Sequence, residues 1–548
     1  MRNKFISIDQ NSHSLWDTVP KLHALTAAGW RGRHFVEDVD VAFTRRGATP
    51  DQIGDESLEL APESYYRDGA SDWGAALFYT RFLGRNPLYL RELEPLLGIT
   101  VKAAAKKLDI SVDALYQRYS VSDNWQLIGS SYLFDRNCHR VIGDLQTAQI
   151  APFLREILAL ARRDLKQAFP DRQAAARIDR WFDRETGLVQ ELLAQHGETT
   201  LPRFYQAWLH HHLGSSCQYS LTSELFAADP RQTSKNPLLA PFLENYEAMA
   251  EAYNRAIRET GELLHPLDLT LGELPYFAVG RRQRRMFRAN LFCRNRKLFY
   301  ADREWPLDPA GQPPLARMAQ DGLLAIVGKA MVMVVEARRR DGGAPLALPE
   351  HGSLYMTAAH AWQRQLRKLK LPMADTFPVL RVKMHFLQRL REIRNQPFTP
   401  PEYLRKRLNS ATLEVAEFAQ SLPELRGQAE CELTACRDPA GRSRLLKELD
   451  PELDTEIDRL EDERRRLARQ AETRPRASEI WETAKRLKQQ QFRQFVERTV
   501  DNLHISRLDY WNSRGALLPW SVALGGEDFY RNLIARAEVE SETDLTDH

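Results

Sequence analysis

Apolar residues recur at helical spacing over much of this chain. The segments 150–169 and 237–260 place apolar side chains three and four residues apart, which predicts two amphipathic helices. Between residues 273 and 305, aromatic residues occur in short runs separated by Gly and polar residues, which predicts a small β-hairpin or meander. The apolar run at 323–338 then predicts a buried helix that is too short to span a bilayer.

The next segments predict an α/β sheet. Residues 344–348 form a short apolar run, and 353–369 have helical periodicity with Ser353 as the expected N-cap. Residues 377–384 predict another strand. Because short strands alternate here with helices, we expect a helix-rich α/β fold.

The last third of the sequence has a heptad pattern. Apolar residues occupy the inner heptad positions between Leu453 and Ala471, whereas Glu, Asp and Arg fill the outer ones. A second helix is expected at 478–504, which predicts an antiparallel coiled-coil hairpin. We expect Phe492, Phe495 and Val496 to leave apolar surface that packs on the α/β body or on a second copy, and this favours a homodimer.

These patterns divide the chain into five segments. The acidic end at 538–548 is expected to be a loose tail. In chain order, the segments are an irregular N-terminal segment (1–75), a mainly helical region (76–260), an α/β core with a small β-hairpin (261–400), a helical region with the coiled-coil hairpin (401–510), and a C-terminal segment with the acidic tail (511–548).

Composition narrows the class of protein. The 548 residues are 43% hydrophobic and 28% charged, with a net charge of only +3, as in a soluble globular protein without a strong overall field. An odd number of cysteines and no CxxC pair favour reduced thiols in a cytoplasm, and we expect no membrane partner. Walker A, GxGxxG, GxSxG and HExxH motifs are all missing from the sequence, which therefore identifies no cofactor and no metal set.

The turn between the predicted strand at 344–348 and the following helix is the first candidate site. Free backbone N–H groups at the start of a helix that follows a sheet strand are a common place for ligands. We expect Ser353 and Tyr355 to contact a small polar ligand there. Glu350 or His351 would act as the acid or base.

A basic stretch at 280–299 carries eight Arg or Lys residues between three phenylalanines. Three interpretations are open: stacking on single-stranded nucleic acid, a strand pair with aromatics inward and arginines outward, or binding of a ligand anion. In the third interpretation, the positive charge near the ligand comes from Arg281, Arg282, Arg284 and Arg285.

Residues 100–119 have helix-turn-helix spacing, with a second helix expected from Ser111. That helix offers Asp113, Gln117 and Arg118 to a duplex, which is a small supply of contacts for reading DNA. A structural helical corner and a nucleic-acid-associated protein that uses this segment together with the basic stretch both remain open.

The second half of the chain carries a set of single positions in a fixed order: Gly352, Tyr355, Leu371, Pro372, Met373, Pro378 and Arg381. Together with the order of segments from about residue 255 to 530, this set resembles the bacillithiol biosynthesis cysteine-adding enzyme family. The resemblance implies a Rossmann-like open sheet core with an appended long antiparallel coiled coil, a pocket facing the turn at 349–355, and a ligase or transferase reaction of the cysteine-adding type.

The N-terminal half departs from that family. Its Gly-Gln-Gln motif with a glycine-rich loop, and its acidic-histidine cluster, have no counterpart in this sequence. Three functions therefore stay open: an enzyme-like protein that binds a small polar or anionic ligand, the nucleic-acid-associated protein, and a non-catalytic dimeric scaffold.

Overall fold

The computed structural model describes most of the chain. The described residues are 3–9, 14–44, 76–85, 88–120, 125–131, 139–227, 236, 238–261, 264–282, 285–300, 303–353, 355–372, 375–469 and 471–542. The fold is helix-rich α/β with mixed parallel and antiparallel strands, as expected. Within these residues, no helix is both long enough and apolar enough to cross a membrane.

A six-stranded sheet lies at the centre of the body. All its neighbouring strands run parallel except β17, which pairs antiparallel with β14. In spatial order, the strands are β17 (Glu538–Glu542), β14 (Val379–Lys383), β13 (Leu346–Pro349), β1 (Lys4–Ile8), β2 (Arg31–Val36) and β7 (Gln218–Leu221).

Two predictions about the chain ends are wrong for the described residues. The N-terminal segment was expected to be irregular, yet it supplies β1, an inner strand of the sheet, and its neighbour β2. The acidic end was expected to be loose, yet 538–542 form the edge strand β17, whose Glu540 and Glu542 pair with Lys383 and Arg381. Residues 543–548 lie outside the described part.

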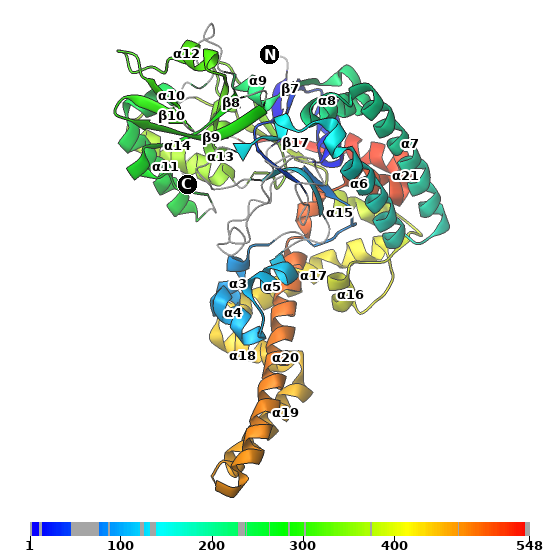
Figure 1. The fold of residues 1–548 in the computed structure, drawn as a ribbon. Helices are drawn as coiled ribbons and strands as arrows, with labels where there is room; N and C mark the ends of the chain where they lie inside the picture. The colour runs from blue at the N-terminus through cyan, green and yellow to red at the C-terminus, as the bar shows by residue number, and fades with distance from the viewer. Residues whose placement is uncertain are drawn as a thin grey trace.

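Helices cover both faces of this sheet because the strand side chains alternate between two hydrophobic cores. Phe5 packs in the core that contains α1 (Leu15–Ala27), whereas Ile6 and Ile8 pack in the core that contains α14 (Tyr355–Lys368). Figure 1 shows the two helical layers on either side of the sheet. The α1 side also holds α6 (Thr147–Ala168), α7 (Arg172–His196), α8 (Leu201–Leu213) and α21 (Leu517–Ala535), and the α14 side holds α11 (Tyr246–Thr260) and α13 (Ala330–Ala337).

A second sheet contains the predicted meander. Its path is β11 (Arg303–Pro306), β10 (Lys297–Tyr300), β9 (Arg285–Arg294), β8 (Glu273–Arg282) and β12 (Leu323–Gly328), with β6 (His139–Arg140) beside β9. The buried helix expected at 323–338 is therefore wrong in its first half. That half is strand β12, and the helix α13 begins only at Ala330.

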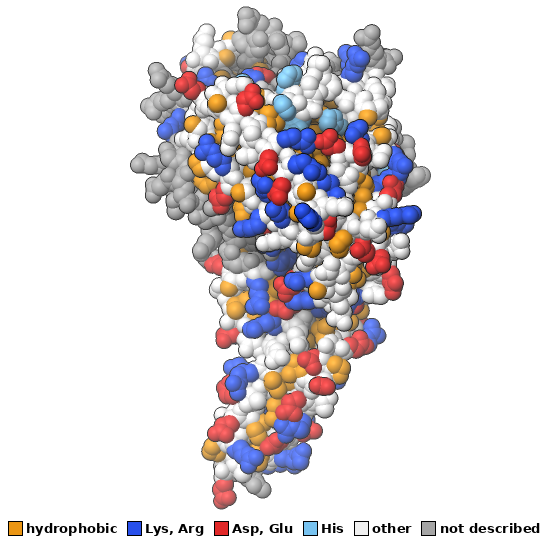
Figure 2. Space-filling model, turned by 90° about the vertical axis from the view of Figure 1, so that its right-hand side faces the viewer, with side chains coloured by type: hydrophobic (Ala, Val, Ile, Leu, Met, Phe, Trp, Pro, Cys, Tyr) orange, Lys and Arg blue, Asp and Glu red, His pale blue; other side chains and the backbone are white. Residues whose placement is uncertain are grey.

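Helices between residues 439 and 506 form a stalk that projects from the body (Figure 1). Helices α19 (Pro451–Leu467) and α20 (Arg474–Ser506) run antiparallel, since contacts pair Glu463 with Arg476 and Asp454 with Gln491. Leu460 is buried between them. Charged side chains of both signs cover the stalk, and some hydrophobic side chains are exposed between them (Figure 2).

The expected apolar surface near the base of α20 is covered within the chain. Phe492, Phe495 and Val496 are buried in a cluster with helices α3 (Leu90–Leu97) and α4 (Val101–Leu108). The homodimer that this surface favoured remains a prediction, and these three residues no longer support it.

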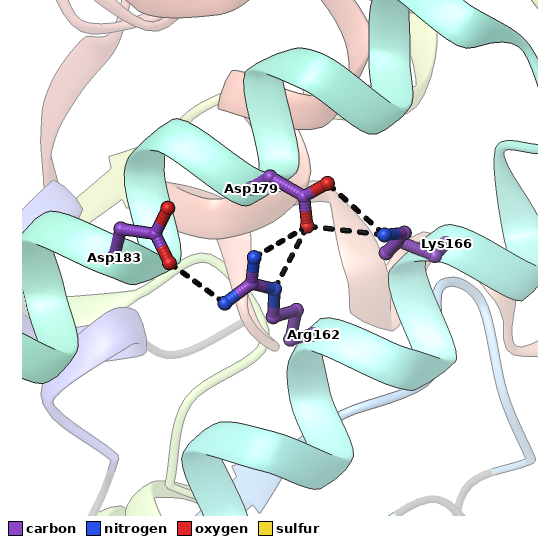
Figure 3. A network of polar contacts seen from close by, with 4 residues as sticks. All are labelled: Arg162, Lys166, Asp179 and Asp183. Carbon is purple, nitrogen blue, oxygen red and sulfur yellow. Dashed lines mark hydrogen bonds and ion pairs between the residues drawn. The ribbon is translucent and has the colours of Figure 1, made fainter.

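Surface ion pairs join the two long helices α6 and α7. Arg162 donates hydrogen bonds of 2.8 Å to both Asp179 and Asp183, and Lys166 lies 3.0 Å from Asp179 (Figure 3). Exposed pairs of this kind add little stability each. Because these opposite charges neutralise one another on an exposed surface, we assign the four residues a structural role in joining α6 to α7.

Candidate functional site

The predicted turn after β13 is tightly constrained. The N–H of Glu350 donates to the Val382 carbonyl at 3.0 Å and to the Ser513 hydroxyl at 3.2 Å. Arg381 donates to the Gly352 carbonyl at 2.5 Å. A Cβ atom at Gly352 would lie 2.6 Å from the Pro349 ring, so the turn has room only for glycine there. The backbone of this turn is thus held by two neighbouring segments.

The polar side chains of the turn are only partly satisfied. One carboxylate oxygen of Glu350 and the hydroxyl of Ser353 are buried and have no hydrogen-bond partner among the described residues. His351 is exposed and Tyr355 is half-buried. Ser353 was expected to cap the helix, but its φ of 58° is left-handed and its hydroxyl accepts no hydrogen bond from any described residue, so that prediction is wrong.

A second set of polar side chains follows β1, the strand beside β13. Asp9 is buried, accepts a hydrogen bond of 3.2 Å from Thr18, and lies 3.0 Å from Nε2 of His34. Nδ1 of His34 lies 3.0 Å from the Ser7 hydroxyl. The Ser7 hydroxyl and both ring nitrogens of His34 are used in these buried contacts, which hold Asp9 in place rather than forming a hydrolase triad.

Charged groups on the first turns of α1 lie beside the segment at 508–516. Arg514 Nη1 is 3.8 Å from the Asp17 carboxylate. Burial raises the pKa of Asp17 to about 6, although Arg514 and Lys21 oppose the shift. Burial also lowers the pKa of Lys21, which Asp9 and Asp17 oppose. Buried charges at the end of a sheet strand are a common feature of ligand sites.

Segment 508–516 joins the ends of three strands. Ser513 contacts Glu350 after β13, Asn512 accepts a hydrogen bond of 3.0 Å from the N–H of Leu387 after β14, and Arg514 reaches α1 after β1. Ser14 precedes α1, and its buried hydroxyl has no partner among the described residues. The carboxyl edge of the sheet therefore gathers unpaired hydroxyl and carboxylate groups beside a buried charge cluster.

The β8–β9 hairpin carries most of the basic stretch at 280–299 and is called the basic hairpin below. It contacts a different part of the same sheet edge. Arg281 and Arg285 are exposed at the end of the β8–β9 pair. Beside them, the Met286 N–H donates to Asp144 at 3.1 Å, and Arg288 pairs with Asp40, four residues after β2. The hairpin thus contacts the extension of β2 rather than the turn after β13. Arg284 and the side chain of Arg282 lie outside the described residues.

The helix-turn-helix segment packs against the stalk. Helix α4 and the turn form as expected, but the second helix α5 (Val112–Leu115) is a single turn that continues as a π-helix. Leu115 and Tyr116 are buried in the cluster that contains the base of α20, and Arg118 lies 3.1 Å from Glu497. Nucleic-acid binding stays a prediction, and this packing adds no support to it.

Sequence reasoning located the turn after β13 but missed Asp9, Asp17, Lys21, His34 and Arg514. One signal was present: "ISID" (residues 6–9) alternates apolar and polar residues and ends in Asp, a few residues before the helix that begins at Leu15. Among the described residues, no group of three or more His, Cys, Asp or Glu is placed to hold a metal ion.

Comparisons with known proteins give no further assignment. No family model matches this chain, and searches of curated proteins and of solved structures find no match.

Proposed function

We propose that the chain binds a small polar ligand at the carboxyl edge of the six-stranded sheet, between β1 and β13. The observation that carries the proposal is a set of three buried oxygen atoms without hydrogen-bond partners among the described residues. They belong to Ser14, after β1, and to Glu350 and Ser353, after β13. A buried polar atom without a partner costs about 1–3 kcal/mol, and a bound ligand removes this cost.

The strand topology supports this position. From β7 to β14, the parallel strands have the chain order third, second, first, fourth and fifth, which is the order of a Rossmann-like sheet. The helices that follow β1 and β13 pack in opposite cores. A crevice between two such strands is the general ligand position in open α/β sheets.

The chemistry of these groups favours a ligand with hydrogen-bond donors. A carboxylate oxygen at Glu350 accepts from an amine or a hydroxyl, and the serine hydroxyls both donate and accept. Amino acids and amino sugars combine such groups with modest size. In this proposal, Tyr355 lies beside the ligand, and the arginines of the basic hairpin supply positive charge from the β2 side.

The proposed reaction is a ligase or transferase step, and it rests on the segment order that resembles the cysteine-adding family. Glu350 or His351 acts as the general acid or base in this proposal. Exposure leaves His351 free to meet a substrate, while Glu350 is held by the backbone contacts of its turn.

Thermal shift measurements on the full chain test the binding step. L-Cysteine, glucosamine and ATP at millimolar concentration are the three probes, because a ligand that binds only the folded state raises the melting temperature. We expect at least one probe to stabilise the wild type and to lose this effect in Glu350→Gln and Ser353→Ala. Stabilisation by none of the three probes contradicts the proposal.

Matched controls are available on the stalk. Glu448 is exposed on α18 (Pro439–Leu449) and Ser478 is exposed on α20. Glu448→Gln and Ser478→Ala should respond to the probe as the wild type does. If they lose the response as fully as the site variants do, the stabilisation does not arise at the sheet edge.

A further inference from the structure

A cavity of about 520 Å³ lies at the base of the stalk. Its walls come from the turn at 81–85, the π-helical residues 118–119, helix α6, the segment 399–406 and helix α20. The volume is in the range of small-molecule sites. This cavity shares no lining residue with the sheet-edge site.

The lining is strongly charged, with five cationic and four acidic side chains. Three acids are already paired: Glu402 lies 2.9 Å from Lys406, Glu497 lies 3.1 Å from Arg118, and Asp164 lies 3.9 Å from Arg81. The side chain of Arg405 makes no hydrogen bond or close ion pair with any residue that the structure describes, although its charge interacts electrostatically with Glu402. The cations are Arg81, Arg85, Arg118, Arg405 and Lys406, and the acids are Asp164, Glu402, Glu497 and Asp501.

Tyr119 adds a second, independent indication of a ligand. It lines the cavity, only 4% of its surface is exposed, and its hydroxyl has no hydrogen-bond partner in the described part of the chain. Burial raises the pKa of Tyr119 to about 12, so the hydroxyl keeps its proton at neutral pH and can donate. An unsatisfied buried donor and a guanidinium without a hydrogen-bond partner, which line the same cavity, are suited to an oxyanion.

We propose that this cavity is a second ligand site, which binds the oxyanion of a small metabolite through Arg405 and the Tyr119 hydroxyl. The oxyanion is a phosphate or a carboxylate, since both accept the planar donor pair of a guanidinium. The walls belong partly to the body and partly to α20. A molecule bound here therefore also links the stalk to the body.

Isothermal titration of the full chain tests the proposal with two probes, pyrophosphate and tricarballylate. We expect saturable binding of at least one probe, weakened about tenfold in both Arg405→Ala and Tyr119→Phe, since each variant removes one hydrogen bond to a charged group. Binding of pyrophosphate alone identifies phosphate compounds, and binding of tricarballylate alone identifies polycarboxylates. Neither variant should unfold, because Arg405 is exposed and Tyr119→Phe keeps the buried ring.

Control variants distinguish this cavity from other sites. Arg466 is an exposed arginine on the stalk, and the hydroxyl of Tyr205 is buried without a described partner elsewhere in the body. Arg466→Ala, Tyr205→Phe and Ser353→Ala should bind the probes as the wild type does. The proposal is overturned if neither probe binds at millimolar concentration, or if Arg405→Ala and Tyr119→Phe bind as tightly as the controls.

Discussion

The backbone N–H of Glu350 donates a hydrogen bond of 3.2 Å to the hydroxyl of Ser513, which is 163 residues away in the chain. This contact fixes the turn after β13 against the segment whose next residue, Arg514, faces Asp17 after β1. Two neighbouring strand ends are thereby held by one segment. The predictions below test this arrangement, the stalk and the cavity at its base.

Replacing Arg514 by Met should destabilise the protein by about 3–5 kcal/mol, because it removes the cationic partner of the buried Asp17 and leaves Lys21 as the remaining cation beside it. Arg514 is only 12% exposed and Asp17 only 4%. Urea denaturation at neutral pH measures the loss. Since burial raises the pKa of Asp17 to about 6, the loss should shrink below that pH, where the carboxyl takes up a proton. A loss that is equal at both pH values contradicts this role of Asp17.

Replacing His34 by Ala should cost about 3 kcal/mol, because Asp9 and Ser7 each lose a buried hydrogen-bond partner. The exposed His351 provides the matched control, and His351→Ala should leave the free energy of unfolding unchanged. Chemical denaturation of both variants measures the difference. Equal stability of the two would show that the contacts around Asp9 are not structural.

In the stalk, Leu460→Asp should lower stability by about 3–5 kcal/mol, because it places an uncompensated charge between α19 and α20. Leu460 is 6% exposed. Thermal melting followed by circular dichroism measures the change, with Arg466→Asp on the exposed face as the control. An unchanged melting temperature in the Leu460 variant is the result that excludes a buried seam.

Asp501 should make stability depend on pH. Burial raises its pKa to about 7, although Lys406 and Arg85 oppose the shift and Glu497 and Glu402 add to it. Between about pH 4 and 7 the folded state keeps a proton that the unfolded state has lost, so stability falls as pH rises and then levels off.

The variant Asp501→Asn carries no such proton. The difference in melting temperature, variant minus wild type, should therefore increase from about pH 5 to about pH 8. Asp462→Asn on the exposed stalk is the control and should follow the wild type at both pH values. A constant difference between the Asp501 variant and the wild type across this range would mean that Asp501 titrates normally.

Two apolar strands of the central sheet were predicted from the sequence, whereas its polar edge strand was not. β13 and β14 were predicted because each begins with apolar residues directly after a proline, Pro345 or Pro378. β17 was missed because "EVESE" is almost wholly polar, and its place in the sheet depends on pairing with β14, including ion pairs to Arg381 and Lys383. β12 was assigned to a helix, since periodicity cannot distinguish a short buried strand from a buried helix.

Some residues of the candidate site could be predicted from the sequence, and others could not. Glu350 and Ser353 could be found because the turn between a strand and a helix is visible in the sequence. His34 and Arg514 could not, because they reach the site from β2 and from the segment before α21. Only the tertiary fold brings such distant residues together.

Hydrogen–deuterium exchange tests the sheet-edge site most directly, on the full chain with and without whichever of L-cysteine, glucosamine or ATP stabilises it. We predict slower exchange in peptides that cover residues 14–21, 346–356 and 508–516, because a ligand there orders the ends of β1 and β13. Slower exchange confined to other parts of the chain, such as 399–406 and 497–501 at the base of the stalk, would contradict binding between β1 and β13.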